Sequence, residues 1–439
     1  MSSPSSGRRA CVISLTWVLQ EPRVLRQVRT LEARGWSVAV VGYAGGASPP
    51  PRWEFLEARP LAPRSAGDTR RIRHMILSDP PAAARRILQI ALHPARVRLQ
   101  RARLAATERL MPAALIRWSF AKAQRHFWRQ SDMLLLKRKI LAKIGRCDLI
   151  IAHDYMTYCL ADALARRDGA RLAIDCHEYA MEQYDHASHS DPRVRAEWMT
   201  VTRPYVDALQ RHFFLRADAL TTVSDGIADL LQADYGLRTR PVVVRSMPFY
   251  EEVPFRPCGE RIEIVYHGLV SPTRNLDVAL QVLKLCRPEF RLTIRGPVDP
   301  GYDAHLMTLA RSIGVEDRFR LMPSVPFSEL VRSASEADIG YFVFSNFSRQ
   351  RHYTLPNKFF EYIMAGLALV VSEVPELSRI VRDHGNGVLV PAFSAEATAA
   401  VLNGLDRTAI DHMKRRSLTA ARDLCWEAEQ HRLIACYGL

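Results

Sequence analysis

The sequence lacks any apolar run near the roughly 18 to 20 residues that a membrane-spanning helix needs, although 48% of its 439 residues are hydrophobic. The apolar stretch 12–18 follows two arginines, but it is too short, and charge follows it too soon, for a signal peptide. We therefore expect a cytoplasmic protein. At this length the chain is predicted to hold about two or three domains.

Metal-binding and disulfide patterns are also missing. The eight cysteines are scattered without a C-x-x-C pair, so the sequence predicts neither a zinc site nor a disulfide framework. His186 and His189 lie close together in the chain, but no further ligands follow at a recognisable spacing. No Asp-x-Asp pair is present either. We expect no metal and no cofactor.

The positive charge is concentrated in one segment. The chain carries 61 Lys and Arg against 46 Asp and Glu, a net charge of +15. Residues 52–146 alone hold 22 of the basic residues and 6 of the acidic ones, so the rest of the chain is close to neutral. Within this segment a basic helical region at 69–146 is predicted in three pieces, 69–91, 95–110 and 113–143.

Three interpretations fit the basic region. Helices that alternate cations with aromatic and aliphatic side chains suit an anionic membrane surface, where the cations meet lipid headgroups. A merely solvated arginine-rich face and a nucleic-acid patch are the alternatives. We favour the membrane surface, because no nucleic-acid-binding module is recognisable. We therefore expect the protein to bind peripherally at the inner face of the membrane.

Strand and helix patterns alternate from the start of the chain. Residues 11–17 form a predicted buried strand, 22–35 a helix with apolar residues at helical spacing, and 37–43 a second strand. The alternation returns after the basic region and continues to the C-terminus. Such units build a parallel sheet covered by helices, so we expect an α/β fold. The Pro-rich stretch 253–260 is the predicted linker between two such domains.

Polar clusters follow two of the predicted strands. His153 and Asp154 end one strand, and His177 and Glu178 follow the next. Open α/β sheets place their ligands beyond the carboxyl ends of the strands, so these side chains are candidates for the reacting centre. The alternative is structural, because Asp154 and Glu178 can simply cap the next helix.

Two helix starts in the second half of the chain suit a phosphate group. Gly268 permits a tight turn, and the helix that opens shortly after it presents backbone N–H groups beside Arg274. In the stretch LPNKFFEYIMAG, Asn357 and Lys358 lie in the first turn of a predicted helix, where the helix dipole favours an anion. Glu361, one turn later, can accept hydrogen bonds from two ribose hydroxyls. The alternative is a capped helix with a solvated glutamate.

The order of these motifs resembles the nucleotide-sugar-binding core of the GT-B glycosyltransferases, in particular the large retaining family called group 1 or family 4. The resemblance covers nearly the whole chain, from Glu-Pro-Arg-Val at 21–24 through the AHD, DCHE and LPNK motifs to the helix around Trp426. It implies two Rossmann-like, doubly wound domains facing across a cleft, with the basic helices inserted in the first. The implied units are 1–255, 256–415 and 416–439, the last a helix that crosses back to the first domain.

The resemblance also implies roles for single residues. Glu361 corresponds to the glutamate that holds the donor's ribose, and His177 to a histidine near the donor sugar and diphosphate. Arg274 corresponds to one of two cations on the diphosphate, while Leu269 occupies the position of the other. A glutamate that contacts the donor sugar in many relatives is replaced by Tyr353, as tends to be so in relatives with an LPNK-type loop.

The implied function is transfer of a sugar from a nucleotide-sugar donor, with retention, to a membrane-linked glycan or lipid acceptor, as in the synthesis of bacterial-type surface polysaccharide or glycolipid. Arg274, Lys358 and the helix N-termini would stabilise the departing diphosphate without a metal. Two alternatives stay open. One is a nucleotide-sugar epimerase of the same fold, and the other is a noncatalytic glycan-binding or scaffold protein, which Leu269 and Tyr353 suggest.

Overall fold

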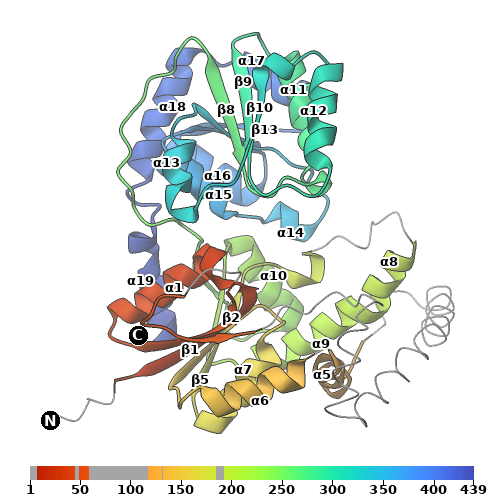
Figure 1. Cartoon of the computed structure of the whole chain (residues 1–439), viewed down its shortest axis with the longest axis vertical. Coiled ribbons are helices and arrows are strands. Elements are labelled where there is room, and N and C mark those ends of the chain that lie inside the picture. Colours follow the sequence, from red (N-terminus) through yellow and green to blue (C-terminus); the bar gives the residue numbers. More distant parts are fainter. Residues whose placement is uncertain (1–6, 45–48, 59–116, 131, 184–191) are drawn as a thin grey trace, which may run out of the picture.

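The computed structural model describes residues 7–44, 49–58, 117–130, 132–183 and 192–439. These residues form two α/β domains that are stacked along the long axis of the molecule (Figure 1). Two of the predicted basic helices, 69–91 and 95–110, lie outside the described residues, as do His186 and His189.

The first domain contains a sheet of seven parallel strands in the order β3-β2-β1-β4-β5-β6-β7. Every residue of β4 and all but the first residue of β5 are buried, as expected for central strands of a sheet covered on both faces. The strands are β1 Arg9–Trp17, β2 Ser37–Tyr43, β3 Glu54–Glu57, β4 Leu149–His153, β5 Arg171–Cys176, β6 Ala219–Thr222 and β7 Val242–Val243.

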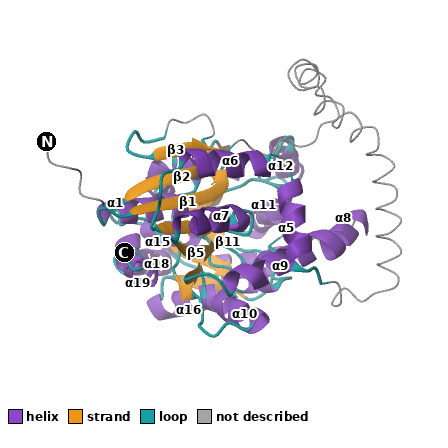
Figure 2. Ribbon diagram, turned by 90° about the horizontal axis from the view of Figure 1, so that it is seen from below, coloured by secondary structure: helices purple, strands orange, loops and turns teal. Residues whose placement is uncertain are grey.

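Helices cover both faces of this sheet (Figure 2). One face packs against α5, α6, α7, α9 and α10, and the other against α1. The helices are α1 Pro22–Ala33, α5 Phe120–Arg129, α6 Met133–Lys143, α7 Tyr158–Asp168, α8 Pro192–Glu197, α9 Arg203–Phe214 and α10 Asp225–Tyr235, with a short 3-10 turn, η3, at Ala180–Glu182.

The helix predicted at 113–143 is two helices in the structure. α5 ends at Arg129, α6 begins at Met133, and the backbone turns between them through Asp132, whose φ is 65°. Asp tolerates this left-handed conformation better than most residues. Each helix buries one apolar stripe and leaves its basic residues outside. No helix in the described part of the chain is long and apolar enough to cross a membrane.

The second domain contains six parallel strands in the order β10-β9-β8-β11-β12-β13. The strands are β8 Ile262–His267, β9 Phe290–Arg295, β10 Phe319–Met322, β11 Ile339–Phe342, β12 Ala368–Ser372 and β13 Gly387–Val390. The helices are α11 Leu276–Leu285, α12 Tyr302–Ser312, α13 Leu330–Ala334, α14 Arg349–His352, α15 Asn357–Met364, α16 Pro375–His384, α17 Ala395–Asn403 and α18 Arg407–Ala420.

Both sheets reverse their strand order at one point, between β1 and β4 in the first and between β8 and β11 in the second. This is the doubly wound arrangement, in which ligands lie in the crevice beyond the carboxyl ends of the strands next to the reversal. The two Rossmann-like domains expected from the sequence are therefore confirmed. The carboxyl ends of the two sheets face each other across the boundary between the domains (Figure 1).

The last helix, α19 (Trp426–Tyr437), packs on the first domain beside α1 (Figure 1). Trp426 and Tyr437 belong to the apolar core on the α1 face of the first sheet. The indole N–H of Trp426 donates to Thr30 Oγ1 at 2.9 Å, and Arg171 donates to the carbonyl of Tyr437 at 2.7 Å. The chain thus connects the two domains twice, at the linker and again before α19.

Candidate functional site

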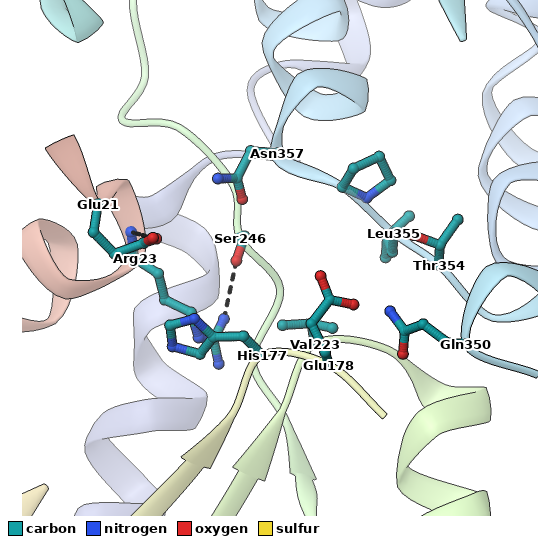
Figure 3. A pocket seen from close by; sticks show the side chains of 11 residues that line it. Glu21, Arg23, His177, Glu178, Val223, Ser246, Gln350, Thr354, Leu355 and Asn357 are labelled. Carbon is teal, nitrogen blue, oxygen red and sulfur yellow. Dashed lines mark hydrogen bonds between the residues drawn. The ribbon is translucent and has the colours of Figure 1, made fainter. Parts of the chain in front are cut away.

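A pocket of about 220 Å³ lies between the two domains, where the carboxyl ends of both sheets meet (Figure 3). Three of the predicted residues, His177, Glu178 and Asn357, line it directly. Its full lining is Glu21, Arg23, His177, Glu178, Val223 and Ser246 from the first domain, and Gln350, Thr354, Leu355, Pro356 and Asn357 from the second.

His177 follows directly after β5 and lies in a cluster of polar side chains. Its Nδ1 is 3.5 Å from Asp154 Oδ2, and its backbone N–H donates to Asp154 Oδ1 at 3.0 Å. Its Nε2 is 2.7 Å from Nδ1 of His153, which ends β4. Burial disfavours the charged imidazolium, but the carboxylates of Asp154 and Asp175 outweigh burial and raise the pKa of His177 to about 9. His177 is therefore protonated at neutral pH.

Asp175, in β5, connects this cluster to Arg23 of α1. It is fully buried and accepts two hydrogen bonds from Arg23, at 2.6 and 2.7 Å, and one each from Gln27 and Thr221. Although burial disfavours the carboxylate, the Arg23 guanidinium holds the pKa of Asp175 well below its usual range. Arg23 also donates to Ser246 Oγ at 3.1 Å (Figure 3), so it joins α1, β5 and the segment that leads to the linker.

Glu178 points its carboxyl group into the pocket (Figure 3). Burial and the nearby charge of Asp154 raise the pKa of Glu178 to about 7, although His177 and Arg274 oppose this shift. A carboxyl group with a pKa near neutrality can take up or release a proton at physiological pH.

Gly268 and Lys358 lie together in the second domain. Gly268 follows β8 with a φ of 128°, and a Cβ atom at this position would lie 2.8 Å from Lys358 Nζ. Residues with a side chain rarely adopt this φ, so the turn favours glycine and brings Lys358 close to the backbone. The Lys358 ammonium lies 3.9 Å from the centre of the Tyr266 ring. Burial, together with the charge of Arg274, lowers the pKa of Lys358 to about 7, against the opposing effect of Glu361.

Arg274 lies at the end of a 3-10 turn that leads into α11. It is exposed, and Asn275 after it has a left-handed φ of 52°, so the backbone turns sharply before the helix begins at Leu276. Asn357 is the first residue of α15, where backbone N–H groups have no partner within the helix. Arg274 and Asn357 thus both lie at helix starts, as the sequence predicts.

Glu361 is 4% exposed, so the interpretation of a solvated glutamate is wrong. Its Oε2 lies 2.7 Å from Nε2 of His267, the last residue of β8, and the backbone N–H of His267 donates to the Tyr362 hydroxyl at 3.1 Å. A buried carboxylate needs such a partner to remain stable. The structure thus places the end of β8 against α15, at the point where the second sheet reverses its strand order.

Two family models match the chain. Residues 20–247 match the glycosyl transferase 4-like domain, and residues 261–406 match the glycosyl transferases group 1 model. The first match alone covers more than half of the chain. The chain belongs to the group 1 glycosyltransferases. No curated protein sequence matches this glycosyltransferase.

Solved structures show the same fold along almost the whole glycosyltransferase. Sucrose-phosphate synthase from Thermosynechococcus elongatus is 13% identical with a TM-score of 0.64, over 98% of each chain. HepE from Anabaena, in complex with UDP and glucose, is 12% identical with a TM-score of 0.60, over 98% of this chain and 100% of that one. WaaG, a glycosyltransferase involved in lipopolysaccharide biosynthesis, is 14% identical with a TM-score of 0.51, over 97% and 98%. These likenesses confirm the GT-B fold of the glycosyltransferase.

One group of side chains in the described part of this glycosyltransferase has the spacing of a metal site. The ligand atoms of His153, Asp175 and His177 all lie within 4.8 Å of one another. However, the Asp175 carboxylate already pairs with the guanidinium of Arg23, which also repels a further cation. The set fits a hydrogen-bonded imidazole pair better than a metal centre.

Sequence reasoning recognised the motifs that contain Arg23 and Asp175 but not the contact between these two residues, and it missed His267. Arg23 and Asp175 lie 152 positions apart in the chain, so no spacing rule connects them. His267 directly precedes Gly268, and its place at the end of a strand was a usable signal.

Proposed function

We propose that this glycosyltransferase takes a sugar from a nucleotide-sugar donor bound mainly by its second domain and transfers it, with retention, to an acceptor held against its first domain. One observation carries this proposal. Lys358 and Glu361 lie on the first two turns of α15, and Asn357, which begins this helix, lines one pocket together with the protonated His177 of the first domain. Retention rests on the family alone.

We assign the donor's parts to the second domain by their chemistry. The buried Glu361 would accept hydrogen bonds from the ribose, and His267 would hold its carboxylate in place. Lys358, Arg274 and the N-terminus of α15 would face the diphosphate. As the glycosidic bond breaks, negative charge grows on the leaving diphosphate, and cations already in place stabilise that charge most. HepE was solved with UDP and glucose, so UDP is the first nucleotide to test.

The first domain would supply the proton chemistry. His177 lines the pocket between the domains and carries a positive charge at neutral pH, so it can stabilise the negative charge that grows on the departing phosphate. Glu178 lies in the same pocket with a pKa of about 7, which suits a group that takes the proton of the acceptor hydroxyl. Closure of the two domains would keep water from the donor.

We further propose a membrane-linked glycan or lipid acceptor and a place at the inner face of the membrane. In the described part of the basic region, Leu134 and Leu135 are 53% and 54% exposed on α6, next to the exposed Arg138 and Lys139. Exposed leucines beside cations suit an anionic lipid surface. WaaG, which shares the fold, acts in lipopolysaccharide biosynthesis.

The donor proposal is tested by a thermal-shift screen of the purified protein against UDP, GDP, ADP, CMP and dTDP. We expect one nucleotide to stabilise the protein and expect this shift to disappear in Glu361→Ala. Radiolabelled nucleotide-sugars of that base are then offered with and without membrane extract. Transfer of label to lipid supports the proposal, whereas isomerised sugar without any acceptor would indicate an epimerase. No stabilisation by any nucleotide would contradict the donor assignment.

The membrane proposal is tested with vesicles. The wild type should co-sediment with vesicles that contain phosphatidylglycerol, and less so as salt is raised. The variant Leu134→Ser/Leu135→Ser should bind more weakly. The variant Leu285→Ser changes an exposed leucine in the second domain and serves as the control. Equal binding of all three proteins would show that α6 does not contact lipid.

A further inference from the structure

A second pocket, of about 240 Å³, lies beside the first. One helix, α9, gives it three charged residues, Arg203, Asp207 and Arg211, and their spacing of four places them on one face of the helix. Arg349 of α14 closes the pocket from the second domain, and Arg117 lies at its edge. The lining therefore contains four guanidinium groups.

Two of these four arginines are balanced by carboxylates. Arg211 lies 3.0 Å from Asp207. Arg349 lies 2.8 Å from Glu182 and 3.1 Å from Asp234. These pairs hold both guanidinium groups in fixed positions along the wall.

The other two arginines have no such partner. Among the residues that the structure describes, neither Arg117 nor Arg203 has a hydrogen bond or an ion pair. Arg203 is half-buried and Arg117 is exposed. Both guanidinium groups line the same pocket, so an anion bound there would be attracted to two cations that have no ion-pair partner among the described residues.

The two pockets share one wall. Glu178 and Gln350 line the first pocket, and their neighbours in sequence, Tyr179 and Arg349, line the second. The backbone N–H of Tyr179 donates to Gln350 Oε1 at 2.5 Å, so this wall is a contact between the two domains. Consecutive residues are roughly 4 Å apart. A group bound against Tyr179 in the second pocket therefore lies across one wall from Glu178.

We propose that the second pocket binds a phosphate group of the acceptor, so that the acceptor's hydroxyl reaches Glu178 in the first pocket. Guanidinium groups bind phosphate oxygens through paired N–H donors. Met181, Met199 and Pro204 form an apolar part of the wall, and such surroundings strengthen the attraction between opposite charges. That this phosphate belongs to the acceptor rests on the proposed glycosyl transfer, whereas phosphate binding itself does not.

Phosphate binding is tested by calorimetry on the full-length protein with inorganic pyrophosphate, in the presence of saturating UDP so that the donor site is filled. We expect Arg203→Gln to weaken pyrophosphate binding at least tenfold and Arg203→Lys to weaken it less. The control, Arg238→Gln, removes an exposed arginine outside the pocket and should bind like the wild type. Unchanged binding in Arg203→Gln, or no binding to the wild type, would overturn the proposal.

UDP binding by the same variants separates this inference from the proposed function. Normal UDP binding in Arg203→Gln shows that the variant is folded and that its donor site is intact. If the wild type binds none of the screened nucleotides, the donor assignment fails, but the pyrophosphate titration without nucleotide still tests the second pocket.

The source of the phosphate is then identified by kinetics. With a sugar diphosphate acceptor, Arg203→Gln should raise KM at least tenfold and leave kcat little changed, while an unphosphorylated acceptor should show no difference. If Arg203→Gln instead weakens only binding to phosphatidylglycerol vesicles, the ligand is a lipid headgroup and the acceptor assignment is wrong. If inorganic phosphate changes the rate of the wild type but not that of Arg203→Gln, the pocket is an effector site. This result would also overturn the acceptor assignment.

Discussion

The carboxylate of Glu361 lies 2.7 Å from Nε2 of His267, and both side chains are almost completely buried. His267 ends β8, and Glu361 lies on α15, so this contact joins two elements 94 residues apart at the point where the second sheet reverses its strand order. The carboxylate is therefore held in a fixed position before any ligand binds.

We predict that Glu361 recognises the ribose hydroxyls through this fixed geometry. Glu361→Gln should weaken UDP binding by about 1.5 to 3 kcal/mol, the range for a hydrogen bond to a charged group. His267→Ala should have a smaller effect in the same direction, because it only releases the carboxylate. Calorimetry with UDP and with 2′-deoxy-UDP measures both effects.

The deoxy ligand is the control for this prediction. The wild type should prefer UDP over 2′-deoxy-UDP, and the Glu361→Gln variant should lose that preference. A variant that still distinguishes the two ligands to the full extent would show that another group binds the ribose.

The sequence was sufficient to predict the elements of the site but not its supporting contacts. The rule that polar residues collect at the ends of parallel strands placed Asp154 and His177 together, and the structure has them 3.5 Å apart. The pairing of Arg23 with Asp175 depends on how α1 packs over β5, which no local pattern records. Likewise, the break between α5 and α6 occurs at Asp132, without a Gly or Pro to indicate it.

We predict that donor binding weakens as the pH rises through 7. Burial and Arg274 lower the pKa of Lys358 to about 7. The side chain is therefore charged below this pH and neutral above it. A bound diphosphate favours the charged form, so binding should be constant below pH 7 and fall by up to about tenfold for each pH unit above it. UDP-glucose is a suitable probe because both of its phosphates are esterified.

The variant Lys358→Met tests the origin of this dependence. Its affinity for UDP-glucose should be low and should not change between pH 6 and pH 8.5. A pH dependence that survives in Lys358→Met would have to come from another group.

We predict that turnover at saturating donor falls as the pH rises through 9. Asp154 and Asp175 raise the pKa of His177 to about 9 despite its burial, so the imidazolium persists through the neutral range and is lost above pH 9. Asp154→Asn removes the carboxylate that contributes most to this shift, and the fall in kcat should then occur at a lower pH. Asp303→Asn, which changes an exposed residue of α12, is the matched control. An unmoved pH profile in Asp154→Asn would exclude His177 as the group responsible.

We predict that Gly226→Ala prevents the two domains from closing. Gly226 of α10 contacts the ring of Tyr353 from the second domain so closely that a Cβ atom would overlap with it. Its backbone N–H also donates to Glu376 Oε1 at 2.7 Å. Alanine stabilises a helix relative to glycine, so the first domain should remain folded. Only the contact between the two domains should be weakened.

Small-angle scattering and kinetics together measure this effect. Gly226→Ala should have a larger radius of gyration than the wild type and a kcat/KM at least tenfold lower, while its UDP affinity should hardly change because the donor site lies in the other domain. Gly404→Ala is the matched control, since an added Cβ there makes only ordinary contacts. Because an open site admits water, Gly226→Ala should also hydrolyse a larger share of the donor that it consumes. Wild-type scattering and wild-type activity in Gly226→Ala would mean that the enzyme works without the contact between Gly226 and Tyr353.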